Sequence, residues 1–86
     1  MILEVEFVIK HKLGSIVECL IEKNLIPLVK IGSKIHQNDG SWIILNIGRW
    51  WYFMDDGRTH ESISFLVKQE TGISSDPVPG DVELVL

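Results

Sequence analysis

Hydrophobic and polar residues alternate along most of this chain, which is the period-two pattern of strands with one buried face. Over residues 3–9 the apolar face of this pattern is made by Leu3, Val5, Phe7 and Ile9. Residues 62–68 repeat the pattern, with Ile63, Phe65 and Val67 on one face. Both segments are therefore predicted to be strands that pack one face against a core.

Glycine and turn signals divide the rest of the chain into short pieces. Gly32 stands between two alternating runs, so residues 28–34 are predicted to form a short strand interrupted at a tight corner. Asn38-Asp39-Gly40 is a hairpin signal, because Asp-Gly suits a type I′ turn. Further turns or loops are predicted at residues 11–15, 55–57 and 71–80, and further strands at residues 41–47, 49–54 and 81–86. Gly48 is predicted to be a bend between two of these strands.

Residues 15–24 allow two interpretations. As a strand, the segment turns Val17, Cys19 and Ile21 inward and its glutamates toward water. As a helix, it begins at Ser15 with a Ser-x-x-Glu capping box closed by Glu18. The β-branched residues favour the strand.

We therefore predict an all-β fold, a small antiparallel barrel of about six strands that spans residues 1–86 as one domain. The alternative is an α+β fold with one helix at residues 15–24.

Composition limits the function classes that this fold can serve. The chain has 86 residues, of which 45% are hydrophobic, so it has enough apolar side chains for one core but little room for a deep active site. Its formal net charge of −4 and its scattered lysines argue against nucleic-acid binding and favour a basic protein partner. The single cysteine, Cys19, excludes an internal disulfide and is expected to be a buried, inert thiol. With no long apolar run and no signal peptide pattern, we expect a cytoplasmic protein outside the membrane.

The order of the segments resembles the second domain of translational GTPases, the β-barrel of the elongation factor Tu type. The resemblance rests on an apolar strand ending near Leu13-Gly14 and on a second apolar strand ending at Ile21-Glu22. It continues through Val29-Lys30-Ile31-Gly32-Ser33 and ends at Gly80-Asp81-Val82. Asn24 stands where the family usually has glycine, and Ser33 stands where it often has aspartate.

The resemblance implies a translation-type barrel without its GTPase domain. The chain has no phosphate loop, so nucleotide hydrolysis is not implied. In that family the barrel contacts the aminoacyl end of tRNA, which makes a translation-associated RNA-binding barrel the alternative function. No residue of this chain is assigned to such a contact.

Two groups of residues are candidates for binding a protein partner. Trp50, Trp51, Tyr52 and Phe53 put aromatic side chains on both faces of one predicted strand, and such residues anchor interfaces. The same aromatic surface would also serve to join two copies of the chain. Four acids are predicted on the outer face of the first hairpin, where they would steer a basic partner: Glu4, Glu6, Glu18 and Glu22.

No group of residues has the pattern of a catalytic or metal site. The segment Asp55-Asp56-Gly57-Arg58-Thr59-His60-Glu61 holds five ionisable side chains, but their spacing matches no metal motif. A pocket lined by Asp56, His60 and Glu61 would be needed for an enzyme. We therefore predict a non-enzymatic binding module, with no metal and no cofactor, that recognises a protein through the aromatic strand, the acidic face or both.

Overall fold

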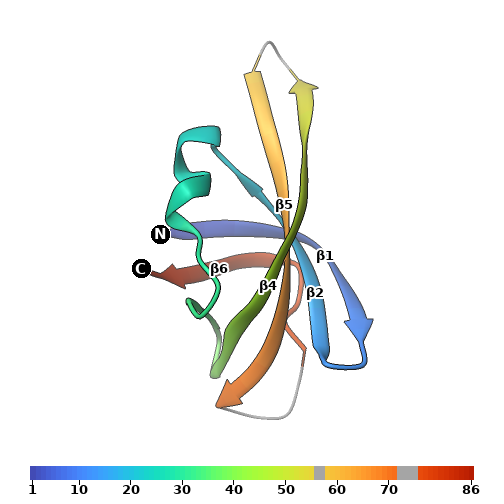
Figure 1. The fold of residues 1–86 in the computed structure, drawn as a ribbon, viewed down its shortest axis with the longest axis vertical. Coiled ribbons are helices and arrows are strands. Elements are labelled where there is room, and N and C mark those ends of the chain that lie inside the picture. The colour runs from blue at the N-terminus through green and yellow to red at the C-terminus, as the bar shows by residue number, and fades with distance from the viewer. Residues whose placement is uncertain (56–57, 72–75) are drawn as a thin grey trace.

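The chain folds into a closed barrel of six antiparallel strands in the order β1-β2-β5-β4-β3-β6. Figure 1 shows this arrangement in a computed structural model that describes residues 1–55, 58–71 and 76–86, with side chains described for residues 1–48, 62–70 and 76–86. The elements are β1 (Ile2–His11), β2 (Gly14–Ile21), the 3₁₀ helix η1 (Lys23–Leu28), β3 (Lys34–Gln37), β4 (Gly40–Asp55), β5 (Arg58–Thr71) and β6 (Gly80–Val85). The predicted all-β barrel is confirmed.

Residues 15–24 are mainly strand, and the helical alternative is wrong. β2 pairs with β1 on one side and with β5 on the other. Its alternate residues Val17, Cys19 and Ile21 are buried, as the strand interpretation predicts. A helix would have left two neighbouring strands without backbone partners, whereas the extended segment satisfies both ladders. Only the end of the segment, from Lys23, is helical, as the first part of η1.

A β-bulge at Glu6 reverses the predicted faces of the second half of β1. Val5 pairs with Cys19, but Phe7 pairs with Glu18, so Glu6 is one extra residue opposite β2. Because a one-residue shift moves every following side chain to the other face, Leu3 and Val5 are buried while Phe7 is 59% exposed and Ile9 53% exposed. Val8, not Phe7, packs against the core. The prediction that Phe7 and Ile9 share the buried face is wrong.

The predicted strand over residues 28–34 is also wrong. η1 ends at Leu28, and β3 begins only at Lys34. Between them Gly32 adopts φ +92°, a backbone conformation that favours glycine. The N–H of Gly32 donates to Ile44 O at 2.8 Å, and the N–H of Ile44 donates to Ser33 O at 2.8 Å. The segment therefore folds as a turn that docks on β4, and the strand starts after the corner.

The β3–β4 hairpin is confirmed, but its turn differs from the prediction. Gln37 pairs with Gly40, so Asn38 and Asp39 are the two loop residues. The positive φ belongs to Asn38, at 52°, not to Gly40. Glycine is needed at position 40 for space instead, because a Cβ there would collide with the ring of Trp42.

Residues 40–55 form one continuous strand, not two strands separated by a bend at Gly48. β4 pairs with β5 across three register irregularities, which lie between Ser41 and Trp42, between Ile44 and Asn46, and between Ile47 and Trp50. These irregularities accommodate the direction change for which the sequence suggested a break. The predicted turn at Asp56-Gly57 lies outside the described residues.

The core fills the barrel with residues from every strand. Among the described side chains the buried apolar set is Leu3, Val5, Val17, Cys19, Ile21, Val29, Ile35, Trp42, Ile44, Ile63, Phe65, Val67, Val82 and Leu84. β5 supplies Ile63, Phe65 and Val67, and Phe65 is the largest fully buried side chain in the described part of the chain. β6 closes the barrel by pairing with both β1 and β3.

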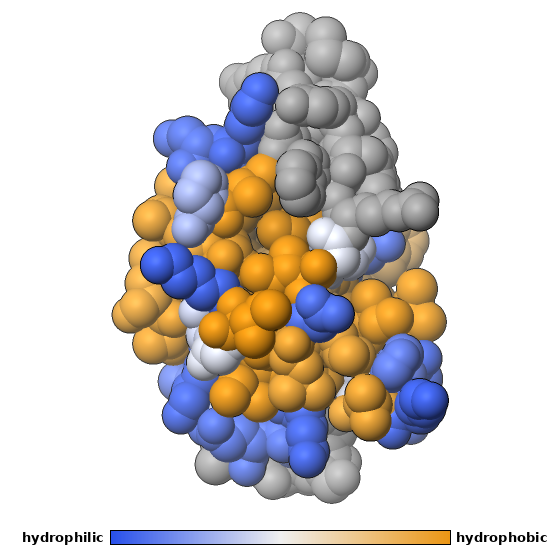
Figure 2. Space-filling view, viewed as in Figure 1, coloured by the Kyte–Doolittle hydropathy of each residue, from blue (hydrophilic) through white to orange (hydrophobic). Residues whose placement is uncertain are grey.

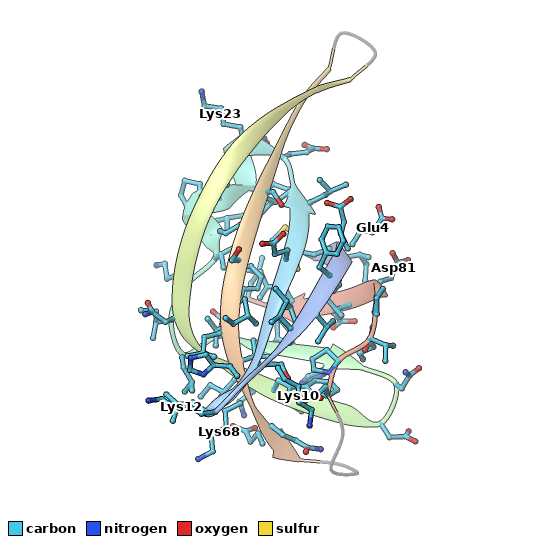
Figure 3. All side chains as sticks on the ribbon, turned by 90° about the vertical axis from the view of Figure 1, so that its right-hand side faces the viewer. Glu4, Lys10, Lys12, Lys23, Lys68 and Asp81 are labelled. Atoms are coloured by element: carbon cyan, nitrogen blue, oxygen red, sulfur yellow. The ribbon has the colours of Figure 1, made fainter. Side chains whose placement is uncertain are left out.

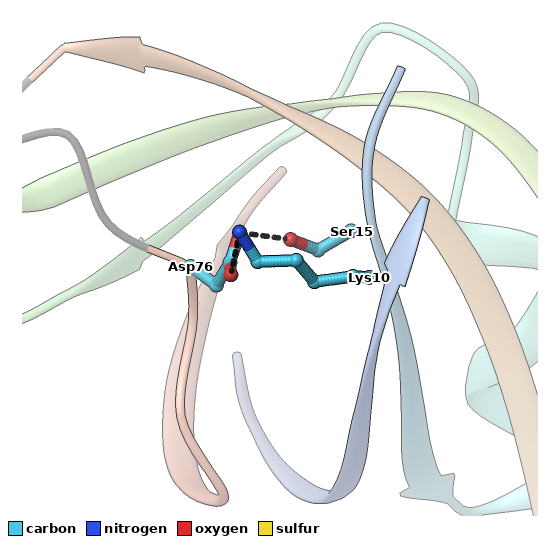
Figure 4. A network of polar contacts seen from close by, with 3 residues as sticks. All are labelled: Lys10, Ser15 and Asp76. Atoms are coloured by element: carbon cyan, nitrogen blue, oxygen red, sulfur yellow. Dashed lines mark hydrogen bonds and ion pairs between the residues drawn. The ribbon is translucent and has the colours of Figure 1, made fainter. Parts of the chain in front are cut away.

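One end of the barrel is crossed by residues 76–78, which are held by polar contacts from distant strands. The Ser15 hydroxyl donates to Asp76 Oδ1 at 2.6 Å, and Lys10 Nζ lies 3.7 Å from Asp76 Oδ2 (Figure 4). Gln37 Nε2 donates to Val78 O at 2.8 Å, and the N–H of Val78 donates to Gln37 Oε1 at 2.8 Å. Pro77 is buried between these two anchors. The segment is therefore part of the folded barrel rather than a loose connection.

Replacing Ser15 should destabilise this barrel end. Ser15 is buried, and its hydrogen bond to a carboxylate is of the strong, charge-assisted kind. Because Asp76 is partly exposed, we expect Ser15→Ala to lower the free energy of unfolding by about 1–2 kcal/mol. Urea unfolding measures this change. Ser33→Ala is the control, and an equal effect of the two variants would contradict the role of the bond.

Cys19 is buried, as predicted, which makes it a reporter of unfolding. Burial, with a smaller contribution from the carboxylates of Glu18 and Glu6, raises the pKa of the thiol from 9.0 to about 12. The native state therefore keeps the proton between these two pH values while the unfolded chain releases it. Stability from this group is complete below pH 9.0 and is lost as the pH rises toward about 12.

The advantage of the wild type over Cys19→Ala should thus be constant up to about pH 8 and shrink from about pH 9 to about pH 10.5. Urea unfolding of both proteins at each pH measures the difference, in which other titrating groups cancel. A constant difference would show that Cys19 does not keep its proton in the native state. Thiol reagents should label Cys19 only after denaturant is added.

Candidate functional site

The described residues hold no cluster that identifies an enzyme. No group of three or more His, Cys, Asp or Glu side chains among them is placed to hold a metal ion. The side chains of Asp56, His60 and Glu61 lie outside the described residues, so the pocket that an enzyme would need there is not tested. No helix in the described part of the chain is long and apolar enough to cross a membrane.

The most distinctive feature of the barrel is the free edge of β4. β3 pairs with β4 only from Gly40 to Ile43, and the turn at Gly32 then covers Ile44. Beyond that point, within the described part of the chain, β4 pairs with β5 alone. The ribbon formed by the ends of β4 and β5 extends past the barrel, as Figure 1 shows at the top of the view. One edge of β4 is therefore open.

The open edge has an irregular half and a regular half. Two register irregularities lie between Ile44 and Trp50, and the N–H of Ile47 donates to the Asn46 side chain at 2.9 Å. From Trp50↔Ile63 to Asp55↔Arg58 the register is then unbroken. Residues 50–55 thus present a regular strand edge, the backbone geometry to which a further strand can add.

The predicted aromatic anchors fall on this regular half. Trp50 pairs with Ile63, Trp51 with Ser62, and Tyr52 with Glu61. The side chains of the aromatic residues, including Phe53, lie outside the described residues. The structure therefore places their backbones at the open edge, and it does not test which of the rings are exposed.

A continuous apolar surface lies beside the irregular half of the edge. Figure 2 shows hydrophobic side chains gathered over β4, the turn before β3 and the end of β6. Lys34 pairs with Ile43 on one side and with Val85 on the other, and the Gly32 turn is hydrogen-bonded to Ile44. We call this surface the front patch. Its most exposed members are Leu28, Ile31, Val85 and Leu86, and Ile43 and Leu45 are half-buried.

The front patch was missed in the sequence because alternation assigns its members to strands. Ile31 looks like a core residue of a strand over residues 28–34, but it is 63% exposed in a turn. Its only signal was the neighbouring Gly32, which marked a corner. A residue at a corner points outward more easily than one within a ladder.

The four predicted acids lie on or beside the β1–β2 hairpin. Glu4 lies opposite Leu20 and is exposed, and Glu22 is exposed just after β2. Glu6 and Glu18 are half-buried and meet at the bulge, where both act on the pKa of Cys19. The structure therefore brings Glu6 and Glu18 together. Glu4 and Glu22 lie nearer the end of the hairpin that is farthest from its turn.

Positive charge gathers at the opposite end of the same hairpin, a feature that the scattered sequence positions did not reveal. Figure 3 shows Lys10, Lys12 and Lys68 together at one end of the barrel, with Glu4 farther along it. A hollow of about 510 Å³ lies among these lysines, His11 and Asp76. Asp76 pairs with Lys10, whereas Lys12 and Lys68 form no ion pair with the described residues.

Comparisons with known proteins do not place this barrel in a family. No family model, no curated protein and no solved structure matches the chain. The barrel is shown, but nothing links it to the second domain of translational GTPases, so that resemblance stays a prediction.

Proposed function

We propose that this chain is a non-enzymatic binding module that takes an extended segment of a protein partner onto the open edge of β4. The observation that carries the proposal is the unbroken register of residues 50–55, which pair with β5 on one edge and with no strand on the other in the described structure. A partner strand added there gains main-chain hydrogen bonds regardless of its sequence. Aromatic residues at the same positions supply contact area that makes the interaction selective.

The irregular half of β4 supports the same proposal. Long open edges invite unspecific pairing, and natural proteins interrupt them with bulges. Here the irregularities lie between Ile44 and Trp50, so residues 44–50 resist regular strand addition and residues 50–55 accept it. The front patch lies next to the interrupted part, where a partner could pack side chains instead of pairing its backbone.

A second copy of the chain is one form that this partner could take. Two regular edges related by a two-fold axis can pair with each other. The measurement below separates self-association from a different protein.

Hydrogen exchange tests the site. We expect those amides of residues 50–55 that point away from β5 to exchange at least about tenfold more slowly when a partner captured from the native host is bound. Trp50→Ala or Trp51→Ala should cost about 2 kcal/mol or more of binding free energy. Leu13→Ala, which truncates an exposed side chain at the opposite end of the barrel, should cost little.

Protection that increases with the concentration of the chain alone would identify a second copy as the partner. Protection confined to β1 and β2, or binding unchanged by both tryptophan variants, would contradict strand addition at β4.

The lysines at the barrel end favour RNA binding as a second candidate function. Lys12 and Lys68 form no ion pair with the described residues and line one hollow, so a phosphate group would meet positive charge there despite the overall charge of −4. Leu13 N–H donates to His11 Nδ1 at 3.1 Å, which leaves the other ring nitrogen of His11 for a ligand.

This alternative predicts a weak, salt-dependent affinity for single-stranded RNA. Lys12→Gln should lower the slope of log affinity against log salt concentration by about one, because one phosphate contact is lost. Fluorescence anisotropy with a labelled RNA measures the slope. Lys30→Gln, an exposed lysine elsewhere, is the control. No RNA binding at low salt would exclude this function.

A further inference from the structure

The outer face of the sheet carries a second hollow, of about 420 Å³, across β2, β5 and β4. Register places its walls side by side: Ile16 lies opposite Leu66, and Leu66 lies opposite Asn46. Glu18 stands next along β2, opposite Ser64. The hollow therefore has apolar walls and one carboxylate.

The hollow exists because its floor is made of small residues. A Cβ on Gly48 would lie 3.2 Å from Ser64 Cβ, closer than most such contacts, so position 48 has no space for a side chain unless Ser64 shifts. A glycine and a serine facing each other on adjacent strands leave a depression between the larger side chains around them. The depression therefore depends on the pairing of β4 with β5, which brings these two small residues together.

The carboxylate of Glu18 has no positive partner in the described structure. Among the described residues, its one hydrogen bond is a long contact from the Ser64 hydroxyl, at 3.4 Å, and neither described ion pair includes it. Glu18 is half-buried, and Glu6 lies near it with the same charge. A carboxylate that is partly removed from water and lies close to another carboxylate is stabilised by an added cation.

The surroundings of this carboxylate fit a long side chain better than a small ion. The bulge at Glu6 turns Phe7 and Ile9 outward, and Phe7 lies opposite Glu18 while Ile9 lies opposite Ile16. Lysine and arginine carry an aliphatic stem that packs on apolar surface and a charged head that needs a carboxylate. The hollow offers both surfaces within one site.

We propose that this hollow receives a lysine or arginine side chain of the protein partner, with its stem against Ile16 and Leu66 and its charged head at Glu18. The inference rests on the proposed function in that the partner is a protein. It concerns a different surface from the open edge, however, and therefore names the chemistry of a second contact. Glu6 and Glu4 on β1 then add to the attraction of a basic partner surface.

A small probe tests this site without the partner. N-acetyl-arginine methylamide is titrated into the ¹⁵N-labelled chain, and the amide shifts of Glu18, Gly48 and Ser64 are followed by NMR. We expect saturable shifts at these positions. The citrulline analogue, which has the same shape without the charge, should bind at least about tenfold more weakly.

Glu18→Gln should weaken the arginine probe by about tenfold or more, because the charged acceptor is lost. Glu83→Gln, which removes the same charge from an exposed position on β6, should leave the affinity unchanged. Equal shifts with citrulline, equal loss in both variants, or shifts that do not saturate would overturn the proposal. Failure of the open edge of β4 to bind a partner would leave this titration unaffected, so the two proposals fail separately.

Discussion

A closed barrel has one interior, and every strand must keep alternate side chains pointed into it. This constraint governs the whole chain, because each backbone hydrogen bond of the ladder fixes the register of the next strand. β5 meets it without interruption from Ile63 to Val67 and is paired on both sides. A strand that carries an extra residue satisfies this constraint only because its side chains change faces after the bulge.

The surfaces that we propose for binding lie at, or directly after, places where the chain departs from this regularity. The bulge at Glu6 brings Phe7 and Ile9 to the outside and sets two carboxylates side by side. The irregularities in β4 lie between the part that β3 and the Gly32 turn cover and the regular open edge at residues 50–55. The corner at Gly32 turns Ile31 outward. The core therefore depends on the regular parts of the strands, and the exposed apolar surface depends on the irregular parts.

The regular parts of the strands can be predicted from the sequence, whereas the irregular parts cannot. Alternation correctly located β1, β2, β5 and β6, and turn chemistry located the β3–β4 hairpin, because these signals are local. Alternation could not reveal the bulge at Glu6, because Phe7, Val8 and Ile9 are all apolar and their order is compatible with either face being buried. The alternating pattern likewise predicted a strand over residues 28–34. In the structure this segment is a turn, which hydrogen-bonds to β4 only at Gly32 and Ser33.

The candidate sites depend even more on contacts between distant segments. Trp50, Trp51 and Tyr52 were singled out as consecutive aromatic residues on one predicted strand. The register adds that their backbones belong to an edge with no strand beside it in the described part of the chain. The hollow at Glu18 could not be predicted, because Gly48 and Ser64 are neighbours only through the pairing of β4 with β5. The lysines at positions 10, 12 and 68 look scattered for the same reason.

Net charge therefore describes this protein poorly. The formal charge of −4 is a sum over a barrel in which Lys10, Lys12 and Lys68 gather at one end, while Glu4 lies farther along it (Figure 3). Such an uneven distribution of charge makes the two molecules orient relative to each other before contact when the partner is charged. In the binding mode that we propose, a basic protein surface would be guided toward the face with Glu6 and Glu18, which lies on the same sheet as the open strand β4. The charge that orients the partner and the backbone edge that holds it would then act in one encounter, although neither lies near the other in sequence.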